Sequence, residues 1–312
     1  MELRVFAEPQ EGASYEQQLA AAQLAERLGF GAFFRSDHYA RIKPGDELPG
    51  PTDSWVTLGA LARETSTIQL GTLVTSATFR LPGPLAIAVA QVDAMSGGRV
   101  ELGLGSGWFE REHDAYGIPF PSVGERFDRL EEQFAILTGL WSAQPGERFS
   151  FDGEHYSLHD SPALPKPARA GGPPLIVGGL GARRTPALAA RYAAEFNVPF
   201  ANVERAKQQF ERVRSACEQS GRDPDSLVYS HAITLCCATS ENELRRRAER
   251  VGLDLADLRA SAAAGSPAEV AERLAEYAAV GSQRAYLQTI DLDDLDQIEL
   301  VAAEVMPQLA QL

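Results

Sequence analysis

The sequence predicts a (β/α)8 barrel with insertions, and three observations favour this fold class. Segments with the period of strands alternate with helical segments along the 312 residues, roughly eight times. Alternation of this kind indicates a parallel sheet covered by helices, and roughly eight units suit a closed barrel. The 44% content of hydrophobic residues is sufficient for a large core. A doubly wound open sheet is the main alternative. We expect residues 1–312 to form one domain with an insertion at about 142–173.

The expected elements follow one another from the first residues onward. Strands are predicted at residues 3–7, 31–34, 68–76, 100–104, 174–178, 196–200, 227–238 and 284–290. Ser14 and Gln17 have the spacing of a capping box, and Gly29 is expected to end the helix that they begin. Further helices are predicted at 53–62, 82–95, 127–141, 203–217, 241–251 and 295–305, and from 185 and 266. A loop is expected at 40–52 and a small hairpin at 149–158.

Composition excludes several classes of function. Lysine and arginine total 29 against 43 acidic residues, so the formal charge is −14, and partners such as nucleic acid or a membrane surface are disfavoured. No apolar run approaches the roughly 20 residues that span a bilayer, and no signal-peptide segment begins the sequence, so we expect a cytoplasmic protein. The cysteines and histidines lack the spacing of disulfide or metal sites, so no metal is expected.

A glycine-rich turn follows the fourth predicted strand. Gly105, Ser106 and Gly107 come directly after it, and glycines allow a sharp turn and the close approach of a ligand to the backbone. Trp108, Glu112 and other polar residues come next. We interpret this stretch as the mouth of an active site, the alternative being a tight turn followed by a solvated loop.

Barrel topology predicts that polar residues just past each strand converge on one mouth. The residues in such positions are Glu8, Asp37, His38, Thr72 to Ser76, Ser106, Gly107, Gly178 to Gly181, Asn197, His231, Gln288 and Thr289.

Asp37 and His38 are the most suggestive pair. An imidazole titrates near neutral pH, so His38 can exchange a proton during a reaction, and Asp37 can hydrogen-bond a ligand. The alternative is a capping aspartate beside a histidine satisfied by backbone groups. Glu112 and His113 either line the pocket or lie in a polar loop.

The turn from Gly178 to Gly181 precedes a predicted helix. Free N–H groups at a helix start form an anion site, to which Arg183 adds positive charge. This is not a full dinucleotide fingerprint, because Arg184 stands in place of the third glycine. A glycine-rich turn without a ligand is the alternative.

Six motifs together resemble the luciferase-like monooxygenase superfamily, in particular its coenzyme F420-dependent oxidoreductases. In order they are FFRSDHY (33–39), LGTLVTSATFRLPGPLA (70–86), GGRVELGLGSGWFEREHDAYG (97–117), GERFDRLEE (124–132), PLIVGGLG (174–181) and GSPAEVAERLAEYAAVG (265–281). The resemblance covers nearly the whole chain. It implies a (β/α)8 barrel, usually a homodimer, with a flavin or deazaflavin at the carboxyl ends of the strands.

The resemblance also implies roles for individual residues. His38 is the expected catalytic residue, and Leu73 and Val74 are expected to form a strand bulge, often with a cis peptide, behind the cofactor ring. The expected cofactor-binding residues are Asp37, Leu73, Val74, Thr75, Ser106, Gly107, Trp108, Gly178, Gly179, Leu180, Gly181 and Arg183. The expected substrate-pocket residues are Glu8, Glu112, His113 and Asn197.

The implied function is hydride transfer between coenzyme F420 and a small organic substrate. A phosphorylated sugar is a poor candidate, because residues 192–204 contain no lysine or arginine. One alternative is a two-component monooxygenase that uses flavin mononucleotide (FMN), and another is a non-catalytic barrel that binds a flavin or deazaflavin. An aldolase or isomerase is also possible, but no lysine stands at a strand end to form a Schiff base.

Overall fold

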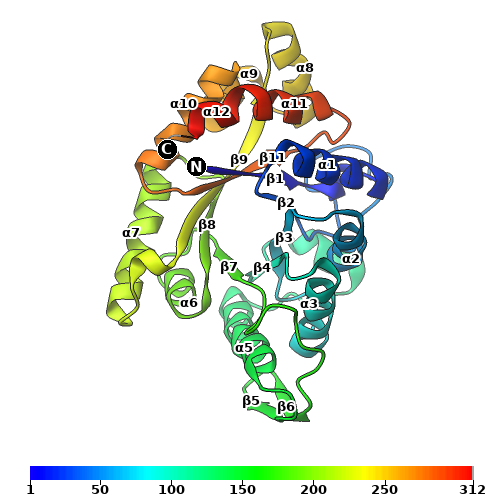
Figure 1. Ribbon diagram of the computed structural model, residues 1–312, viewed down its shortest axis with the longest axis vertical. Helices are drawn as coiled ribbons and strands as arrows, with labels where there is room; N and C mark the ends of the chain where they lie inside the picture. The colour runs from blue at the N-terminus through cyan, green and yellow to red at the C-terminus, as the bar shows by residue number, and fades with distance from the viewer. Residues whose placement is uncertain (311–312) are drawn as a thin grey trace.

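Eight parallel strands form a closed barrel in the computed structural model, which describes residues 1–310 (Figure 1). The barrel strands are β1 (Glu2–Ala7), β2 (Ala32–Arg35), β3 (Gln69–Ser76), β4 (Val100–Gly105), β7 (Leu175–Gly178), β8 (Glu195–Pro199), β9 (Val228–Cys237) and β11 (Arg284–Thr289). Pairing runs from β9 through β11, β1, β2, β3, β4 and β7 to β8, and β8 pairs with β9 to close the ring. The predicted fold class is therefore confirmed, and the open-sheet alternative is wrong.

Helices surround the barrel on its outer side (Figure 1). They are α1 (Tyr15–Leu28), α2 (Ser54–Glu64), α3 (Pro82–Ser96), α4 (Glu110–Tyr116), α5 (Val123–Ser142), α6 (Arg184–Tyr192), α7 (Val203–Gln219), α8 (Glu241–Val251), α9 (Leu255–Ser261), α10 (Pro267–Ala279), α11 (Leu295–Leu300) and α12 (Met306–Leu309). Capping boxes begin α1 at Ser14 and α10 at Ser266, and Gly29 ends α1 in the left-handed conformation with φ +82°.

The core has an inner and an outer part. A main apolar cluster fills the space between strands and helices, and a smaller cluster of Phe6, Ala32, Phe34, Ile176, Ala232 and Tyr286 fills the barrel itself. Glycine is required at Gly103 of β4, where a Cβ atom would lie 2.2 Å from the carbonyl oxygen of Thr72. This close approach of β3 and β4 lies beside the site described below.

Several segments differ from the sequence-based expectation. The hairpin in the insertion consists of β5 (Phe149–Asp152) and β6 (Ser157–Ser161) and extends three residues beyond the expected end. Residues 110–116 form the short helix α4 rather than a loop, and α9 and the strand β10 (Ala263–Gly265), which pairs with β9, were not expected. Within residues 1–310, the helices are too short or too polar to cross a membrane.

Candidate active site

A cavity of about 550 Å³ opens at the carboxyl ends of the barrel strands. Its walls include Phe6, Ile42, Pro199, Phe200 and Ala232, which were not singled out from the sequence. Most of the residues predicted from the sequence also line this cavity: Glu8, Asp37, His38, Leu73, Val74, Ser106, Gly107, Trp108, Glu112, Gly178, Gly179, Leu180 and Asn197. The topology thus brings together side chains from seven strands, as expected for a barrel mouth.

His38 is held by a carboxylate on the cavity wall. Its Nδ1 lies 2.9 Å from Oε1 of Glu112, and the other oxygen of Glu112 accepts a hydrogen bond of 2.8 Å from the backbone N–H of Tyr39. Burial lowers the pKa of His38, but the hydrogen bond and the charge of Glu112, aided by Glu8 and Asp37, outweigh burial and raise this pKa above its usual value. Nε2 of His38 has no hydrogen-bond partner among residues 1–310, so it is the ring nitrogen left to a ligand.

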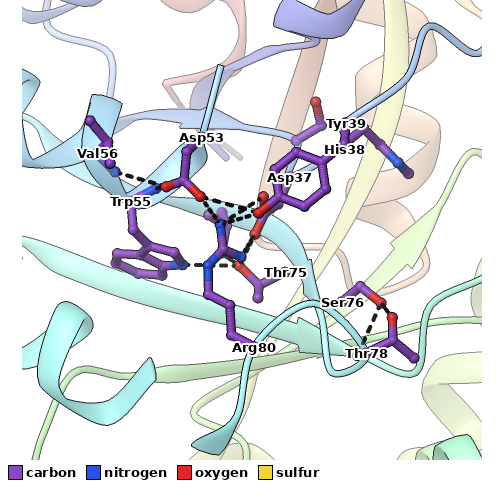
Figure 2. A network of polar contacts seen from close by, with 12 residues as sticks. Asp37, His38, Tyr39, Asp53, Trp55, Val56, Thr75, Ser76, Thr78 and Arg80 are labelled. Carbon is purple, nitrogen blue, oxygen red and sulfur yellow. Dashed lines mark hydrogen bonds and ion pairs between the residues drawn. The ribbon is translucent and has the colours of Figure 1, made fainter. Parts of the chain in front are cut away.

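Asp37 belongs to a buried network centred on Arg80 (Figure 2). Nη1 of Arg80 donates to Asp37 over 2.5 Å, and Nη2 donates to Asp53 over 2.5 Å and to the hydroxyl of Tyr39 over 2.9 Å. Arg80 lies in the loop after β3, whereas Asp53 caps helix α2 through the N–H groups at its start. The guanidinium therefore joins the loop that carries His38 to two neighbouring segments. Arg80 and Tyr39 were not among the site residues predicted from the sequence.

Thr75 continues this network into strand β3. Its hydroxyl donates to Asp37 over 2.9 Å and accepts a bond of 3.3 Å from the indole N–H of Trp55 (Figure 2). Thr75 does not line the cavity, although Leu73 and Val74 just before it do. The pairing of β3 with β4 shifts between Thr72 and Thr75, and the peptide bond between Leu73 and Val74 is cis. The expected bulge and cis peptide are both present.

The glycines at the end of β4 and just past it allow this segment to pack closely against β3. A Cβ atom at Gly105 would lie 2.9 Å from a methyl carbon of Val74, and one at Gly107 would lie 2.4 Å from the hydroxyl of Ser76. Gly107 also has a φ of +80°, which favours glycine. The backbone here therefore comes close to the wall formed by Leu73 and Val74, and a flat group can lie against it.

The second glycine turn leads from the cavity to the start of α6. Gly178, Gly179 and Leu180 line the cavity, and Gly179 has a φ of +139°. Gly181 and Arg183 lie outside the cavity and are exposed. The turn thus connects the cavity wall to the positive end of a nine-residue helix, a geometry suited to an anionic group.

Two histidines lie away from the cavity, contrary to expectation. His113 is fully buried, with Nδ1 2.8 Å from the carbonyl oxygen of Phe109 and Nε2 2.6 Å from the hydroxyl of Thr78. His231 is hydrogen-bonded to Ser282 through Nδ1, and its ring stacks on a tyrosine ring with 4.0 Å between the ring centroids. Burial lowers the pKa of His231 to about 3. Both side chains therefore contact neighbouring segments of the fold instead of lining the cavity.

Glu8 presents a carboxyl group to the cavity from the end of β1. Burial raises the pKa of Glu8 above its usual value, although the hydrogen bond with Gln288 and the charges of His38 and Lys43 act in the opposite direction. Glu8, His38 and Glu112 therefore lie together on the wall of one cavity. Within residues 1–310, no cluster of three or more histidine, cysteine, aspartate or glutamate side chains suits a metal ion.

A family model described as luciferase-like monooxygenase matches residues 1–256. The chain belongs to this family. One relative from this family is the F420-dependent hydroxymycolic acid dehydrogenase of Mycobacterium tuberculosis, 34% identical over 216 residues, which are 67% of this chain and 56% of that protein. Another is the F420-dependent glucose-6-phosphate dehydrogenase of Beutenbergia cavernae, 38% identical over 152 residues, 48% of this chain and 43% of that protein. The chain thus spans about half the length of the curated relatives it matches.

Solved structures with a similar fold superpose on nearly the entire chain. An F420-dependent secondary alcohol dehydrogenase in complex with an F420–acetone adduct has a TM-score of 0.86 and 19% identity, covering 99% of this chain and 98% of that one. The monooxygenase RslO1 from Streptomyces bottropensis has a TM-score of 0.83 and 23% identity, covering 99% and 100%. These similarities show that the fold is shared.

Proposed function

We propose that this protein is an oxidoreductase that uses coenzyme F420 to transfer a hydride to or from a small organic substrate. The observation that carries the proposal is the single cavity that joins the wall of Leu73 and Val74, the glycine turn at 105–107 and the free Nε2 of His38. The names of the two curated relatives, both F420-dependent dehydrogenases, support the choice of cofactor.

The residues around the cavity fit a flat ring with a phosphate-bearing tail. Leu73 and Val74 would lie behind the ring, and Ser106, Gly107 and Trp108, which line the same cavity, would contact it. Gly178 to Gly181 and Arg183 would hold the tail phosphate at the start of α6, where N–H groups and the helix dipole favour an anion. When bound, the deazaflavin supplies a carbon that donates or accepts a hydride.

His38 is the proposed catalytic residue. Glu112 fixes its Nδ1 and therefore orients the ring, so that Nε2 can take a proton from a substrate hydroxyl or return one to a carbonyl. Asp37, which Arg80 and Thr75 hold, keeps the backbone of the neighbouring His38 in place. Ile42 and Trp108 line the cavity from two loops and would exclude water from the reacting groups once ligands are bound.

The proposal is tested by titrating the purified apoprotein with F420 and, separately, with FMN, while following fluorescence. We expect saturable binding of F420 and weaker binding of FMN, followed by a change in F420 absorbance when a suitable alcohol or carbonyl compound is added. Tight FMN binding with oxygen-dependent product formation indicates a monooxygenase instead. Cofactor binding without reduction or oxidation of any substrate, and without an effect of His38→Ala, indicates a non-catalytic barrel.

We also propose that the chain forms a homodimer through the outer face of α2 and α3. Val56 on α2 is 76% exposed, and Leu81 and Ile87 beside or within α3 are 65% and 49% exposed. The two helices pack side by side on the barrel (Figure 1). Neighbouring exposed apolar side chains are typical of a protein interface. Light scattering after size-exclusion chromatography is expected to give twice the mass of one chain, and a single-chain mass contradicts the proposal.

We further propose a cytoplasmic location for the protein. Cys217, Cys236 and Cys237 are free and buried. Burial raises the pKa of Cys236 to about 11 and that of Cys237 to about 12, so these thiols behave as small apolar side chains and suit a reducing compartment. Cell fractionation with an antibody against the native protein tests this location.

A further inference from the structure

We propose that the cavity selects an uncharged substrate with an apolar body, excludes phosphorylated and carboxylated compounds, and uses Phe200 as its main specificity-determining side chain. This inference deepens the proposed function and rests on it, because the substrate in question is the one that would exchange a hydride with the cofactor. Three features of the cavity carry it: its lack of cations, its acidic groups and a continuous apolar wall.

Among residues 1–310, neither lysine nor arginine lines the cavity. Two cations in the loops beside the cavity, Arg80 and Lys43, make their contacts with other groups. Arg80 is bound by Asp37 and Asp53, and the ammonium group of Lys43 donates to the backbone carbonyl of Val251. A phosphate or carboxylate on a substrate that lies away from the turn at the start of α6 would therefore lose its water without gaining a countercharge, which is costly in an enclosed space.

The titratable groups on the cavity oppose an anion as well. Glu112 pairs with His38, so that this histidine already has its negative partner. Glu8 adds a second carboxyl group to the lining of the cavity. A further negative charge near these groups would be repelled by any carboxylate and would have to compete with Glu112 for His38.

One side of the cavity is an apolar wall formed by Phe6, Pro199, Phe200 and Ala232. The wall is continuous, because the rings of Phe6 and Phe200 lie 6.4 Å apart and the backbone N–H of Phe200 donates to the carbonyl of Ala232 over 2.9 Å. Phe200 follows β8 directly, has a φ of +45° and remains 50% exposed. An exposed phenyl ring on a cavity wall stabilises a ligand by burying apolar area, so Phe200 has the most to gain from an aliphatic or aromatic substrate.

The first experiment compares two ketones of the same chain length on the wild-type apoprotein, hexan-2-one and the anion 5-oxohexanoate. Binding is measured by ligand-observed NMR, in which each of the two compounds competes with the other for the apoprotein. Neither cofactor nor turnover is needed. We expect hexan-2-one to bind at least about tenfold more tightly than 5-oxohexanoate. Equal affinities, or tighter binding of the anion, would overturn the inference.

The second experiment changes the wall itself. Phe200→Ala is expected to weaken hexan-2-one binding by about fivefold or more, and Phe200→Arg to bring 5-oxohexanoate to at least the affinity of the ketone. Leu253→Ala, at an exposed leucine that does not line the cavity, is the matched control and should leave both affinities unchanged. If Phe200→Ala does not fold, Phe200→Leu takes its place. Unchanged affinities in a folded Phe200 variant would overturn the role of this residue.

F420 titration of the same proteins keeps the two proposals apart. Preference for the neutral ketone without F420 binding contradicts the proposed function and supports the selectivity of the cavity. F420 binding together with preference for the anion supports the proposed function and overturns the inference.

Discussion

At the amino ends of the barrel strands, Arg4 meets Glu101, Glu195 and Tyr286 in a buried polar network, and at the carboxyl ends Asp37 meets Arg80 and Asp53 in another. Arg4 is 1% exposed, donates to Glu101 over 2.6 Å and to Tyr286 over 2.9 Å, and Tyr286 donates to Glu195 over 2.8 Å. Both networks place guanidinium and carboxylate groups where water is scarce.

Both networks lie beside a cavity, and they differ in the hydrogen-bonding capacity that is left unused there. At the amino ends the cavity has a volume of about 430 Å³, but the charged groups that line it are paired with one another, and Arg284 adds a bond of 2.5 Å to Glu195. At the carboxyl ends the network supports a loop whose next residue, His38, keeps one nitrogen free on a cavity. Buried charge by itself therefore does not mark a site in this protein. A polar group with unused hydrogen-bonding capacity facing a cavity does.

Among variants at the two ends of the barrel, His38→Ala is expected to have the largest effect on turnover. If His38 exchanges the proton, its loss lowers turnover by about 10²–10⁴-fold while F420 affinity changes little. Steady-state kinetics with F420 and a neutral alcohol or ketone, combined with a cofactor titration, measure both quantities. Turnover within threefold of wild type would remove His38 from the mechanism.

Arg4→Met at the other end is expected to act on stability instead. Removing the guanidinium leaves Glu101 buried without its partner, although Glu195 keeps Arg284, and this should lower the free energy of unfolding by about 3–5 kcal/mol. Denaturant unfolding measures the loss, and turnover per folded molecule should remain near that of wild type. A stable variant with greatly reduced turnover would mean that the amino-end network takes part in function.

Arg80→Gln is expected to affect both stability and turnover, because Arg80 joins the loop of His38 to its neighbours. Loss of the two ion pairs should lower the free energy of unfolding by about 2–4 kcal/mol and reduce turnover by about tenfold. Arg80→Lys is the matched variant and should restore only part of each, since a lysine cannot bind Asp37, Asp53 and Tyr39 in the same fork geometry. Thermal melts and kcat distinguish this positioning role from direct catalysis, because the KM for substrate should stay nearly constant.

Glu112→Gln is expected to have the smallest effect and to shift a pH profile. Glu112 raises the pKa of His38 against the opposing effect of burial, so without its charge the pKa of His38 falls. In the direction of alcohol oxidation the neutral imidazole accepts the proton, and kcat/KM therefore rises as pH increases through this pKa. The rise should move to lower pH in Glu112→Gln. A profile that does not move, or moves to higher pH, would contradict the assignment.

The sequence predicts most of the barrel because its local signals agree with one another. Ser14 and Ser266 begin helices where expected, and the strands end at the polar residues that line the cavity. The cis bulge at Leu73 and Val74 came only from the family resemblance, since the residue pattern there indicates a plain core strand.

The residues that the sequence does not predict correctly are those whose positions depend on the conformation of the loops. Arg80 lies several residues past its strand, and nothing local links it to Asp37 and Asp53, 43 and 27 positions earlier in the chain. His113 carries the residue type of a pocket group, but helix α4 turns it toward Thr78 and away from the cavity. Phe200 lies just past β8, and its apolar side chain by itself indicates only a core residue. Its exposure follows from the turn that the chain makes there.

The central claim is that the carboxyl-end cavity holds the redox cofactor. A crystal structure of the protein soaked in F420 tests it most directly. The account predicts that the tricyclic ring lies against Leu73 and Val74 within reach of His38, with the tail phosphate at the start of α6. A ring bound elsewhere on the molecule, or no bound ring at saturating F420, would contradict it.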